Sequence, residues 1–164
     1  IRVHGKGFHK YDNVRIGING RLDTLQAAIL LAKFAIFPEE VELRNEAAQR
    51  YTSLLTPDAS RSPAPSLLTP DIPAGYRSVW AQYSLLAQDE GARTTIMDKL
   101  NQSGIPTAIY YPKPLHLQTA FAPLGYRPGA FPVSEDAASR IFSLPMHPYL
   151  TAQDQSNICK ELLK

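Results

Sequence analysis

The sequence predicts an α+β fold of the sandwich-like kind, in which helices pack on a small sheet. Helix-forming residues dominate positions 23–55, and strand-forming residues follow at 78–87. A further helical segment at 90–103 separates the strand-like segment 78–87 from a second one at 106–111. The chain has 164 residues, of which 44% are hydrophobic, so it is long enough for one core of ordinary size. We therefore expect a single globular domain.

Charge and cysteine content narrow the class of protein. Seventeen basic and fifteen acidic residues leave a net charge of +2, which is too balanced to favour nucleic acid or a membrane as partner. Cys159 is the single cysteine of the sequence, so no intrachain disulfide can form and a reducing compartment fits. No apolar run reaches the roughly 20 residues that span a bilayer, and no signal peptide is visible. We expect a cytoplasmic protein, and the start at Ile1 suggests the remainder of a longer chain.

The segment from Asp23 to Phe37 is predicted to be a helix with almost no polar face. Only Gln26 and Lys33, which lie seven residues apart, mark a polar edge. The rest of this helix is therefore expected to be buried. Pro38 ends the helix, because proline has no backbone N–H and its ring clashes with the preceding turn.

A second helix is predicted from Pro38 to Leu55. Proline suits the first turn, and the two glutamates that follow it lie near the positive end of the helix dipole. Its apolar face is expected to enter the core and consists of Val41, Ala47, Ala48, Tyr51, Leu54 and Leu55. Residues 57–78 contain five prolines, which predicts a surface connection with room for short edge strands only.

Residues 78–111 are predicted to form a strand, a helix and a second strand. The first strand covers 78–87, the helix covers 90–103 and closes at Gly104 in a left-handed cap, and the second strand is "PTAIYY" at 106–111. A unit of about 35 residues has the length of a crossover, so the two strands are expected to be parallel and the crossover right-handed. The apolar positions of the first strand and the helix are Val79, Ala81, Tyr83, Leu85, Ala92, Ile96 and Leu100.

The last third of the chain is predicted to be loop, short helix, short strand and helix. Residues 113–132 are rich in proline and glycine and are expected to be loop, residues 133–140 a short helix, and "IFSLPM" at 141–146 a strand. The final helix begins at Thr151, whose partner three residues on is Asp154. It is expected to bury Ile158, Cys159 and Leu162.

"GINGRLD" at 17–23 is the first candidate site. Asn19, Gly20 and Arg21 precede a helix N-terminus, where free amide groups and the helix dipole favour an anion, and Arg21 adds a planar cation suited to carboxylate or phosphate. The alternative is a plain helix cap, with Asp23 as the N-cap and Asn19 tolerating a turn. Spacings typical of metal sites, phosphate loops and nucleophilic catalysis are absent from the sequence, so no metal is expected.

"IYYPKPLH" at 109–116 is the second candidate. Adjacent tyrosines on a strand face opposite ways, so one of Tyr110 and Tyr111 can pack inward while the other reaches a ligand. The alternative is ordinary packing in the core and at the sheet edge.

Three motifs in a fixed order show a family resemblance. They are "YDNVRIGINGRLDTLQAAILLAKF" followed by "RNEAAQRY", then "GIPTAIYYPKPLHLQTAF", then "SLPMHPYL". Together they resemble the DegT/DnrJ/StrS family of sugar aminotransferases. The segment "RLDTLQAAILL" is most similar to that of members that act on 3-ketosugars, including those that make 3-amino uronic acids for lipopolysaccharide. The resemblance implies the small C-terminal domain of a fold-type I aminotransferase, with helices on a small sheet.

The resemblance also implies a cofactor and a reaction. The family uses pyridoxal 5′-phosphate (PLP), bound to a lysine of a large N-terminal domain, to move an amino group from glutamate to a ketosugar linked to UDP or dTDP. The lysines of this sequence lie in no segment that matches the lysine segment of the family, and they are Lys6, Lys10, Lys33, Lys99, Lys113, Lys160 and Lys164. We therefore expect residues 1–164 to be a C-terminal fragment that lacks the large domain and is inactive alone.

The same resemblance assigns site residues. Family members are homodimers with active sites at the subunit interface, so Asn19 is expected to reach the cofactor phosphate of the partner subunit and Arg21 the substrate. Tyr111 is expected to line the sugar site, with Tyr110 as a second candidate at a variable position, and His116 and His147 are expected to be structural. Helix 23–37 would be apolar because it packs between domains. The alternative is a non-enzymatic nucleotide-sugar-binding or dimerisation module derived from such an enzyme.

Overall fold

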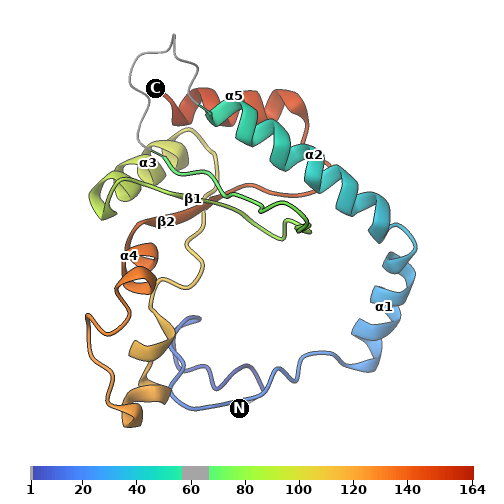
Figure 1. The fold of residues 1–164 in the computed structure, drawn as a ribbon. Coiled ribbons are helices and arrows are strands. Elements are labelled where there is room, and N and C mark those ends of the chain that lie inside the picture. Colours follow the sequence, from blue (N-terminus) through green and yellow to red (C-terminus); the bar gives the residue numbers. More distant parts are fainter. Residues whose placement is uncertain (1, 57–66) are drawn as a thin grey trace. The chain divides into compact units, whose positions relative to one another are not determined.

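The computed structural model describes residues 2–56 and 67–164 (Figure 1). These residues divide into two compact units, where composition predicts one domain. The hairpin unit comprises residues 2–35 and 111–139, and the sheet unit comprises residues 36–56, 67–110 and 140–164. Helices and a small antiparallel sheet make up the structure, so the predicted α+β class is confirmed.

Helix α1, Thr24–Phe34, begins where the sequence predicts. Asp23 is its N-cap, and the Asp23 carboxylate accepts a hydrogen bond of 3.0 Å from the backbone N–H of Gln26. The prediction that the apolar side chains of this helix are buried is wrong for this chain, because α1 has no buried residue and its Leu25 and Leu31 are 78% and 76% exposed. Burying such a helix needs facing apolar surface, which the described residues do not supply.

Helix α2, Phe37–Leu55, confirms the prediction in detail. Pro38 stands in its first turn, together with Glu39 and Glu40, whose charges suit the positive end of the helix dipole. Its buried residues are Val41, Ala47, Ala48, Tyr51 and Leu55, and Leu54 packs against them half-buried. Of the predicted surface connection after this helix, residues 57–66 lie outside the described residues.

The sheet unit contains a two-stranded antiparallel sheet, in which β1, Tyr83–Leu86, pairs with β2, Ile141–Leu144. The register places Tyr83 opposite Leu144 and Leu86 opposite Ile141. One antiparallel bridge extends the sheet on each side, from Leu68 to Leu86 and from Ala108 to Ser143. In the described part of the proline-rich connection, residues 67–78, the expected edge strand is a single bridge at Leu68.

The predicted second strand at 106–111 is wrong, because this segment makes only the bridge at Ala108. Pro106 has no N–H to donate to a ladder, and Tyr111 adopts a φ of +59°, which is not extended. Both β1 and the Ala108 segment run antiparallel to β2, so they are parallel to each other as expected. They are not neighbours, since β2 lies between them.

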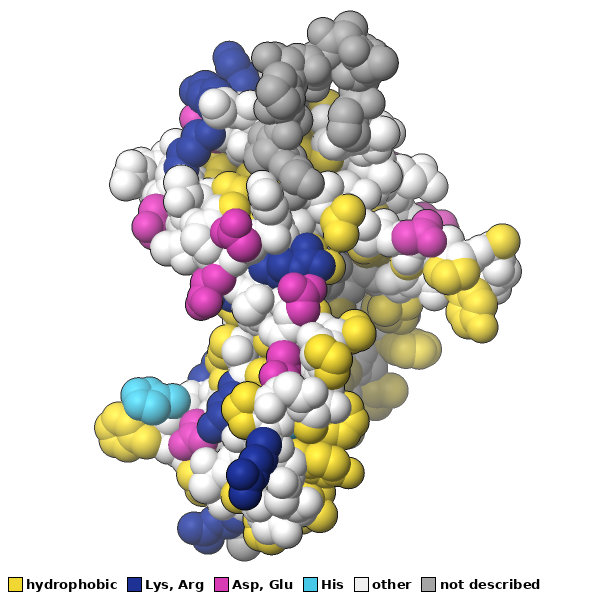
Figure 2. Space-filling model, turned by 60° about the vertical axis from the view of Figure 1, so that its left-hand side comes forward, with side chains coloured by type: hydrophobic (Ala, Val, Ile, Leu, Met, Phe, Trp, Pro, Cys, Tyr) yellow, Lys and Arg dark blue, Asp and Glu magenta, His cyan; other side chains and the backbone are white. Residues whose placement is uncertain are grey.

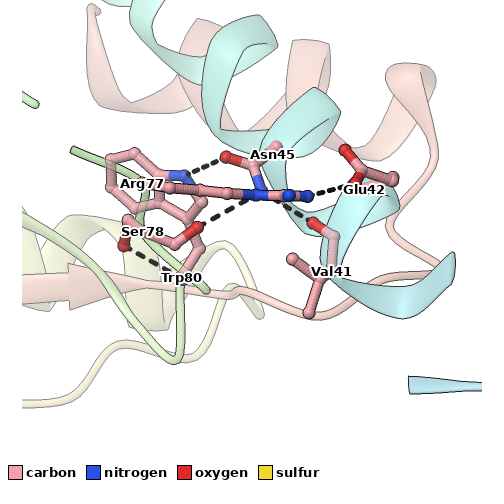
Figure 3. Close-up of polar contacts among 6 residues, drawn as sticks. All are labelled: Val41, Glu42, Asn45, Arg77, Ser78 and Trp80. Carbon is pink, nitrogen blue, oxygen red and sulfur yellow. Dashed lines mark hydrogen bonds and ion pairs between the residues drawn. The ribbon is translucent and has the colours of Figure 1, made fainter. Parts of the chain in front are cut away.

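Strand β1 begins five residues later than predicted, and Trp80 gives the reason. Its φ of +48° lies in the left-handed region, which interrupts extended backbone. The Trp80 backbone N–H donates to Ser78 Oγ at 3.1 Å, and its indole Nε1 donates to Asn45 Oδ1 at 3.0 Å (Figure 3). Val79, predicted to face the core, is therefore 52% exposed, while Trp80 is buried instead.

Asn45 ties this irregular segment to α2 (Figure 3). Its Nδ2 donates to the carbonyl oxygens of Val41 at 2.8 Å and Ser78 at 3.2 Å, while its Oδ1 accepts from Trp80. An ion pair between Arg77 and Glu42 adds a contact at the surface. The oxygen and the nitrogen of the Asn45 amide therefore both hold residues 78–80, which form no strand hydrogen bonds that could hold them in place.

The remaining helices of the sheet unit complete its core. Helix α3, Glu90–Gln102, is capped by Asp89, and Gly104 follows it with a φ of +74°, as predicted. Helix α5, Ala152–Leu162, is capped by Thr151, whose hydroxyl accepts from the backbone N–H of Asp154 at 3.1 Å. Helix α5 packs against α2 and α3, and α3 packs against β2 (Figure 1). The largest fully buried side chains are Tyr51, Tyr83, Leu85, Leu100, Phe142, Gln155 and Leu162.

The hairpin unit contains short helices where the sequence predicts loop. The 3₁₀ helices η1, Leu115–Leu117, and η2, Thr119–Leu124, precede α4, Pro132–Arg140, whose last residue belongs to the sheet unit. Gly125 ends η2 with a φ of +76°. Within residues 2–56 and 67–164, no helix is both long and apolar enough to cross a membrane.

Candidate functional site

Asn19 lies on the second arm of a short antiparallel hairpin at the start of the chain, and Arg21 follows that arm. Single bridges join Val3 to Asn19 and Lys6 to Asn13. Gly5 allows the close approach of the two arms, because its φ is +73° and a Cβ there would lie 1.7 Å from the carbonyl oxygen of Arg15. The "GKG" sequence at 5–7 therefore belongs to the first arm of the hairpin that also contains Asn19.

The structure brings Asn19 and Arg21 together. The Nε atom of Arg21 donates a hydrogen bond of 2.8 Å to Asn19 Oδ1, and both residues are exposed. This bond uses the oxygen of the Asn19 amide and one N–H of the guanidinium. In the described part of the chain, the amide NH₂ group of Asn19 and the terminal NH₂ groups of Arg21 make no other hydrogen bond. The pair thus presents several donors and one fixed positive charge to solvent.

Asp23 is a helix cap, which confirms the simpler interpretation of this residue. Its carboxylate accepts from the N–H of Gln26 at the N-terminus of α1. An anion bound to the same amide groups would meet this negative charge, so the end of α1 is a poor anion site. The donors that can bind an anion here are the side chains of Asn19 and Arg21.

Tyr110 and Tyr111 lie in different units, and the expectation that they alternate on a strand is wrong because the strand is absent. Tyr111 is 72% exposed in the hairpin unit, and its ring stands edge-on to that of Tyr11 with a centroid distance of 6.1 Å. Tyr110 lines a cavity of about 190 Å³ in the sheet unit, together with Ala108 and Ser143. The structure thus places one tyrosine with Asn19 and Arg21 in the same unit, and the other in the sheet unit.

His116 takes part in a polar cluster that sequence reasoning missed. Its Nε2 lies 3.0 Å from Glu135 Oε1, and Glu135 also accepts hydrogen bonds from the backbone N–H groups of Gly129 and Phe131. These backbone bonds, with a smaller effect of His116, hold the pKa of Glu135 below its usual value. The cluster fastens α4 to the loop before it, which is a structural role, as expected for His116. His147 is exposed.

Gln118 is the second residue that was missed. It is only 5% exposed and makes hydrogen bonds through both ends of its amide, to residues of two separate segments. One of its partners is 105 positions away along the chain, so no local pattern in the sequence indicates the contact.

Among the residues that the structure describes, no three His, Cys, Asp or Glu side chains gather to hold a metal ion.

Comparison with known proteins identifies the family. The model of the DegT/DnrJ/EryC1/StrS aminotransferase family matches residues 1–163. A UDP-2-acetamido-2-deoxy-3-oxo-D-glucuronate aminotransferase of Pseudomonas aeruginosa is 40% identical over 99% of this chain and 41% of its own length. A "pleiotropic regulatory protein" of Geobacillus stearothermophilus is 39% identical over the same shares.

A solved structure supports the same assignment. The crystal structure of a DegT/DnrJ/EryC1/StrS aminotransferase from Brucella abortus is 49% identical, with a TM-score of 0.72, over 98% of this chain and 41% of that one. The chain therefore spans about two fifths of the length of these relatives. On the match of nearly all its residues, the chain belongs to the DegT/DnrJ/EryC1/StrS aminotransferase family.

Proposed function

We propose that these residues act as the small C-terminal domain of a PLP-dependent aminotransferase, which transfers an amino group from glutamate to a ketosugar linked to UDP or dTDP. Aminotransferases of this family are PLP-dependent. The observation that carries the proposal is the family match over residues 1–163. The name of the Pseudomonas relative points to a UDP-linked 3-oxo uronate as the first acceptor to test.

The donor set at Asn19 and Arg21 fits the proposed cofactor. A phosphate group needs several hydrogen-bond donors and benefits from positive charge, and this pair offers an amide NH₂ and a guanidinium. We assign Asn19 to the phosphate of a PLP held by a partner subunit, and Arg21 to a carboxylate or diphosphate of the substrate. When bound, PLP supplies the electron sink for moving the amino group. The cofactor lysine would lie outside these 164 residues, in a large domain.

The tyrosines receive a sugar-binding role in this proposal. Tyr111 is exposed in the unit that carries Asn19 and Arg21, so its ring and hydroxyl are accessible to a sugar. Tyr110 lines a cavity of its own unit and is the weaker candidate. Both are assigned to substrate binding.

A homodimer that includes the large domain is the proposed assembly, and the exposed apolar surface of α1 supports packing against a further protein surface. Hydrophobic side chains reach the surface on the face shown in Figure 2. On and beside α1, the exposed apolar side chains are Leu22, Leu25, Ile29, Leu30, Leu31 and Phe34. Such a concentration is typical of surfaces that pack against another protein surface. We propose that α1 packs against the large domain in the assembled dimer.

The proposed product would serve the synthesis of lipopolysaccharide, O-antigen or another cell-surface polysaccharide. The support is the similarity to the Pseudomonas relative, whose name gives a UDP-linked 3-oxo-glucuronate. The segment "RLDTLQAAILL" also resembles that of family members that make 3-amino uronic acids. We place this reaction in the cytoplasm, where the free, buried Cys159 fits a reducing environment.

A second candidate function is a non-enzymatic module that binds a nucleotide sugar or mediates dimerisation. The observation that favours it is the regulatory name of a relative that is 39% identical. The two functions differ in whether an amine is formed, since both allow nucleotide-sugar binding.

Amine formation by the full gene product tests the proposal. The protein is incubated with PLP, glutamate and a UDP-linked 3-ketosugar, and the sugar product is followed by mass spectrometry. We expect conversion of the ketone to an amine that depends on glutamate and PLP. The 164-residue chain alone is expected to give none. Binding of the nucleotide sugar without any amine from the full gene product would favour the second function.

A further inference from the structure

We propose that Gln118 is a positioning residue, which holds the hairpin that leads to Asn19 and Arg21 against the segment that begins with Tyr111. The consequence for catalysis rests on the proposed function. The contact itself rests only on the geometry of the hairpin unit.

Asn13 presents its backbone groups away from the hairpin. It pairs with Lys6, and the ladder hydrogen bonds lie on either side of this pair, donated by the backbone N–H groups of Gly7 at 2.6 Å and Val14 at 3.1 Å. In an antiparallel pair of this type, the N–H and C=O of the paired residue point to the outer side of the strand. Asn13 therefore offers a donor and an acceptor to a third segment.

Gln118 and Ala120 form hydrogen bonds with the backbone N–H and C=O of Asn13. The N–H of Asn13 donates to Gln118 Oε1 at 3.1 Å, and the N–H of Ala120 donates to the carbonyl oxygen of Asn13 at 2.8 Å. Gln118 Nε2 donates to the carbonyl oxygen of Lys113 at 3.2 Å. The amide of Gln118 thus connects the hairpin with the chain just after Tyr111, and burial makes an unpaired amide costly there.

Contacts on either side strengthen this junction. Thr119 Oγ1 donates to Asp12 Oδ1 at 3.4 Å, and the rings of Tyr11 and Tyr111 meet edge-on. Residues 11–13 therefore lie along residues 111–120 at several points. Loss of the central amide should let the hairpin move relative to Tyr111, and Asn19 and Arg21 with it.

Glutamine is the residue that this position requires. Glutamate keeps an acceptor for the N–H of Asn13 but loses the donor to Lys113, and methionine has a similar length but loses both. Gln155 provides a matched control in the sheet unit. It is fully buried, accepts from Arg50 Nε at 2.6 Å and donates to the carbonyl oxygen of Ala47 at 2.8 Å.

The experiment compares Gln118→Met, Gln118→Glu and Gln155→Met in the full gene product. Amide hydrogen exchange is measured for peptides that cover Asn13 and Ala120, and for peptides of α2 and α5. We expect Gln118→Met to speed exchange at Asn13 and Ala120 about tenfold and to leave α2 and α5 unchanged. Gln155→Met should show the reverse pattern, and Gln118→Glu should be intermediate.

Ligand binding and kinetics test the positioning role. We expect Gln118→Met to raise the Kd for PLP and the KM for the nucleotide sugar by about tenfold each, with kcat changed by less than about threefold. Unchanged exchange at Asn13 and Ala120 would overturn the contact, and faster exchange with unchanged Kd and KM would overturn the positioning role. If the unsubstituted gene product forms no amine, the proposed function fails, and the exchange comparison with Gln155→Met still decides whether Gln118 holds the hairpin.

Discussion

The guanidinium of Arg21 is bonded through Nε to the side-chain oxygen of Asn19, at 2.8 Å. Asn19, which we assign to the PLP phosphate, and Arg21, which we assign to the substrate, are thus joined by one hydrogen bond. This bond orients the Asn19 amide so that its NH₂ group, rather than its oxygen, is available to an anion. We therefore expect the two proposed roles to be coupled, so that replacing one residue also changes the contribution of the other.

Substitution of Arg21 and Asn19 in the full gene product tests this coupling. Because a charge-assisted hydrogen bond contributes about 1.5 to 3 kcal/mol, Arg21→Ala is expected to lower kcat/KM by roughly tenfold to a hundredfold. Asn19→Ala is expected to act mainly on PLP affinity. Arg21→Lys keeps the charge but has no Nε–H, so it should also weaken PLP binding. The double alanine variant should lose less than the sum of the two single effects. Strict additivity in steady-state kinetics and PLP titration would contradict the coupling.

Gly5 is expected to be essential for the hairpin. Gly5→Ala places a Cβ 1.7 Å from the carbonyl oxygen of Arg15, so the backbone must shift. Gly125→Ala is the matched control, because its φ of +76° is nearly the same and no atom lies within 4 Å of the added Cβ. Left-handed strain alone costs about 1 kcal/mol, whereas Gly5→Ala should cost at least about 3 kcal/mol of stability or disorder the hairpin. Equal urea-unfolding midpoints and equal hairpin exchange in the two variants would show that the close approach is unimportant.

The exposed apolar side of α1 predicts self-association of the 164-residue chain. Leu25, Leu31 and Phe34 are each at least 70% exposed, which is unfavourable in water for so many side chains on one helix. Leu25→Lys combined with Leu31→Lys is expected to reduce association and dye binding without loss of helix α2 or the sheet. Sedimentation velocity and dye fluorescence measure both effects. A monomeric unsubstituted chain that binds no apolar dye would contradict this account of α1.

Much of the fold was predictable because local patterns determine it. The caps Asp23, Asp89 and Thr151, the turn at Gly104 and the apolar face of α2 all follow from neighbours within four residues. The start of β1 was not predictable. Trp80 is left-handed, and its hydrogen bonds to Asn45 and from Arg44 join residues 35 and 36 positions apart along the chain.

The candidate site shows the same division. Asn19 and Arg21 are two positions apart, and the short "NGR" sequence before a helix indicates both as candidates, although the hydrogen bond between them was not predicted. The role of Gln118 depends on a partner 105 positions away, and that of Glu135 on a histidine 19 positions away. The burial of α1 was wrongly predicted because an apolar pattern indicates that a face is covered, without showing which surface covers it.

Alkaline pH is expected to destabilise the sheet unit. Burial raises the pKa of the Cys159 thiol from 9.0 to about 11 and also raises the pKa of Tyr51 and Tyr83. Since a raised pKa favours the neutral group in the folded state, its contribution to stability is complete below pH 9 and is lost as the pH rises towards 11. Urea unfolding between pH 8 and 11 should show a falling free energy of unfolding. Cys159→Ala should fall less steeply, and identical slopes for the two proteins would exclude a contribution of the thiol.

The central proposal is that Asn19 and Arg21 serve a cofactor site on the neighbouring subunit, and subunit mixing tests it most directly. One version of the full gene product carries Arg21→Ala, and the other carries a substitution of the lysine that binds PLP. The first homodimer is expected to keep roughly a tenth to a hundredth of the unsubstituted kcat/KM, and the second homodimer is expected to be inactive. In a mixed dimer, one site would combine an intact lysine with an intact Arg21 from the partner. We predict that mixing restores aminotransferase activity to about half that of an unsubstituted dimer per mixed dimer formed, since one of two sites is complete. Mixed dimers that form, as shown by two different affinity tags, yet recover no activity would contradict the assignment across the interface.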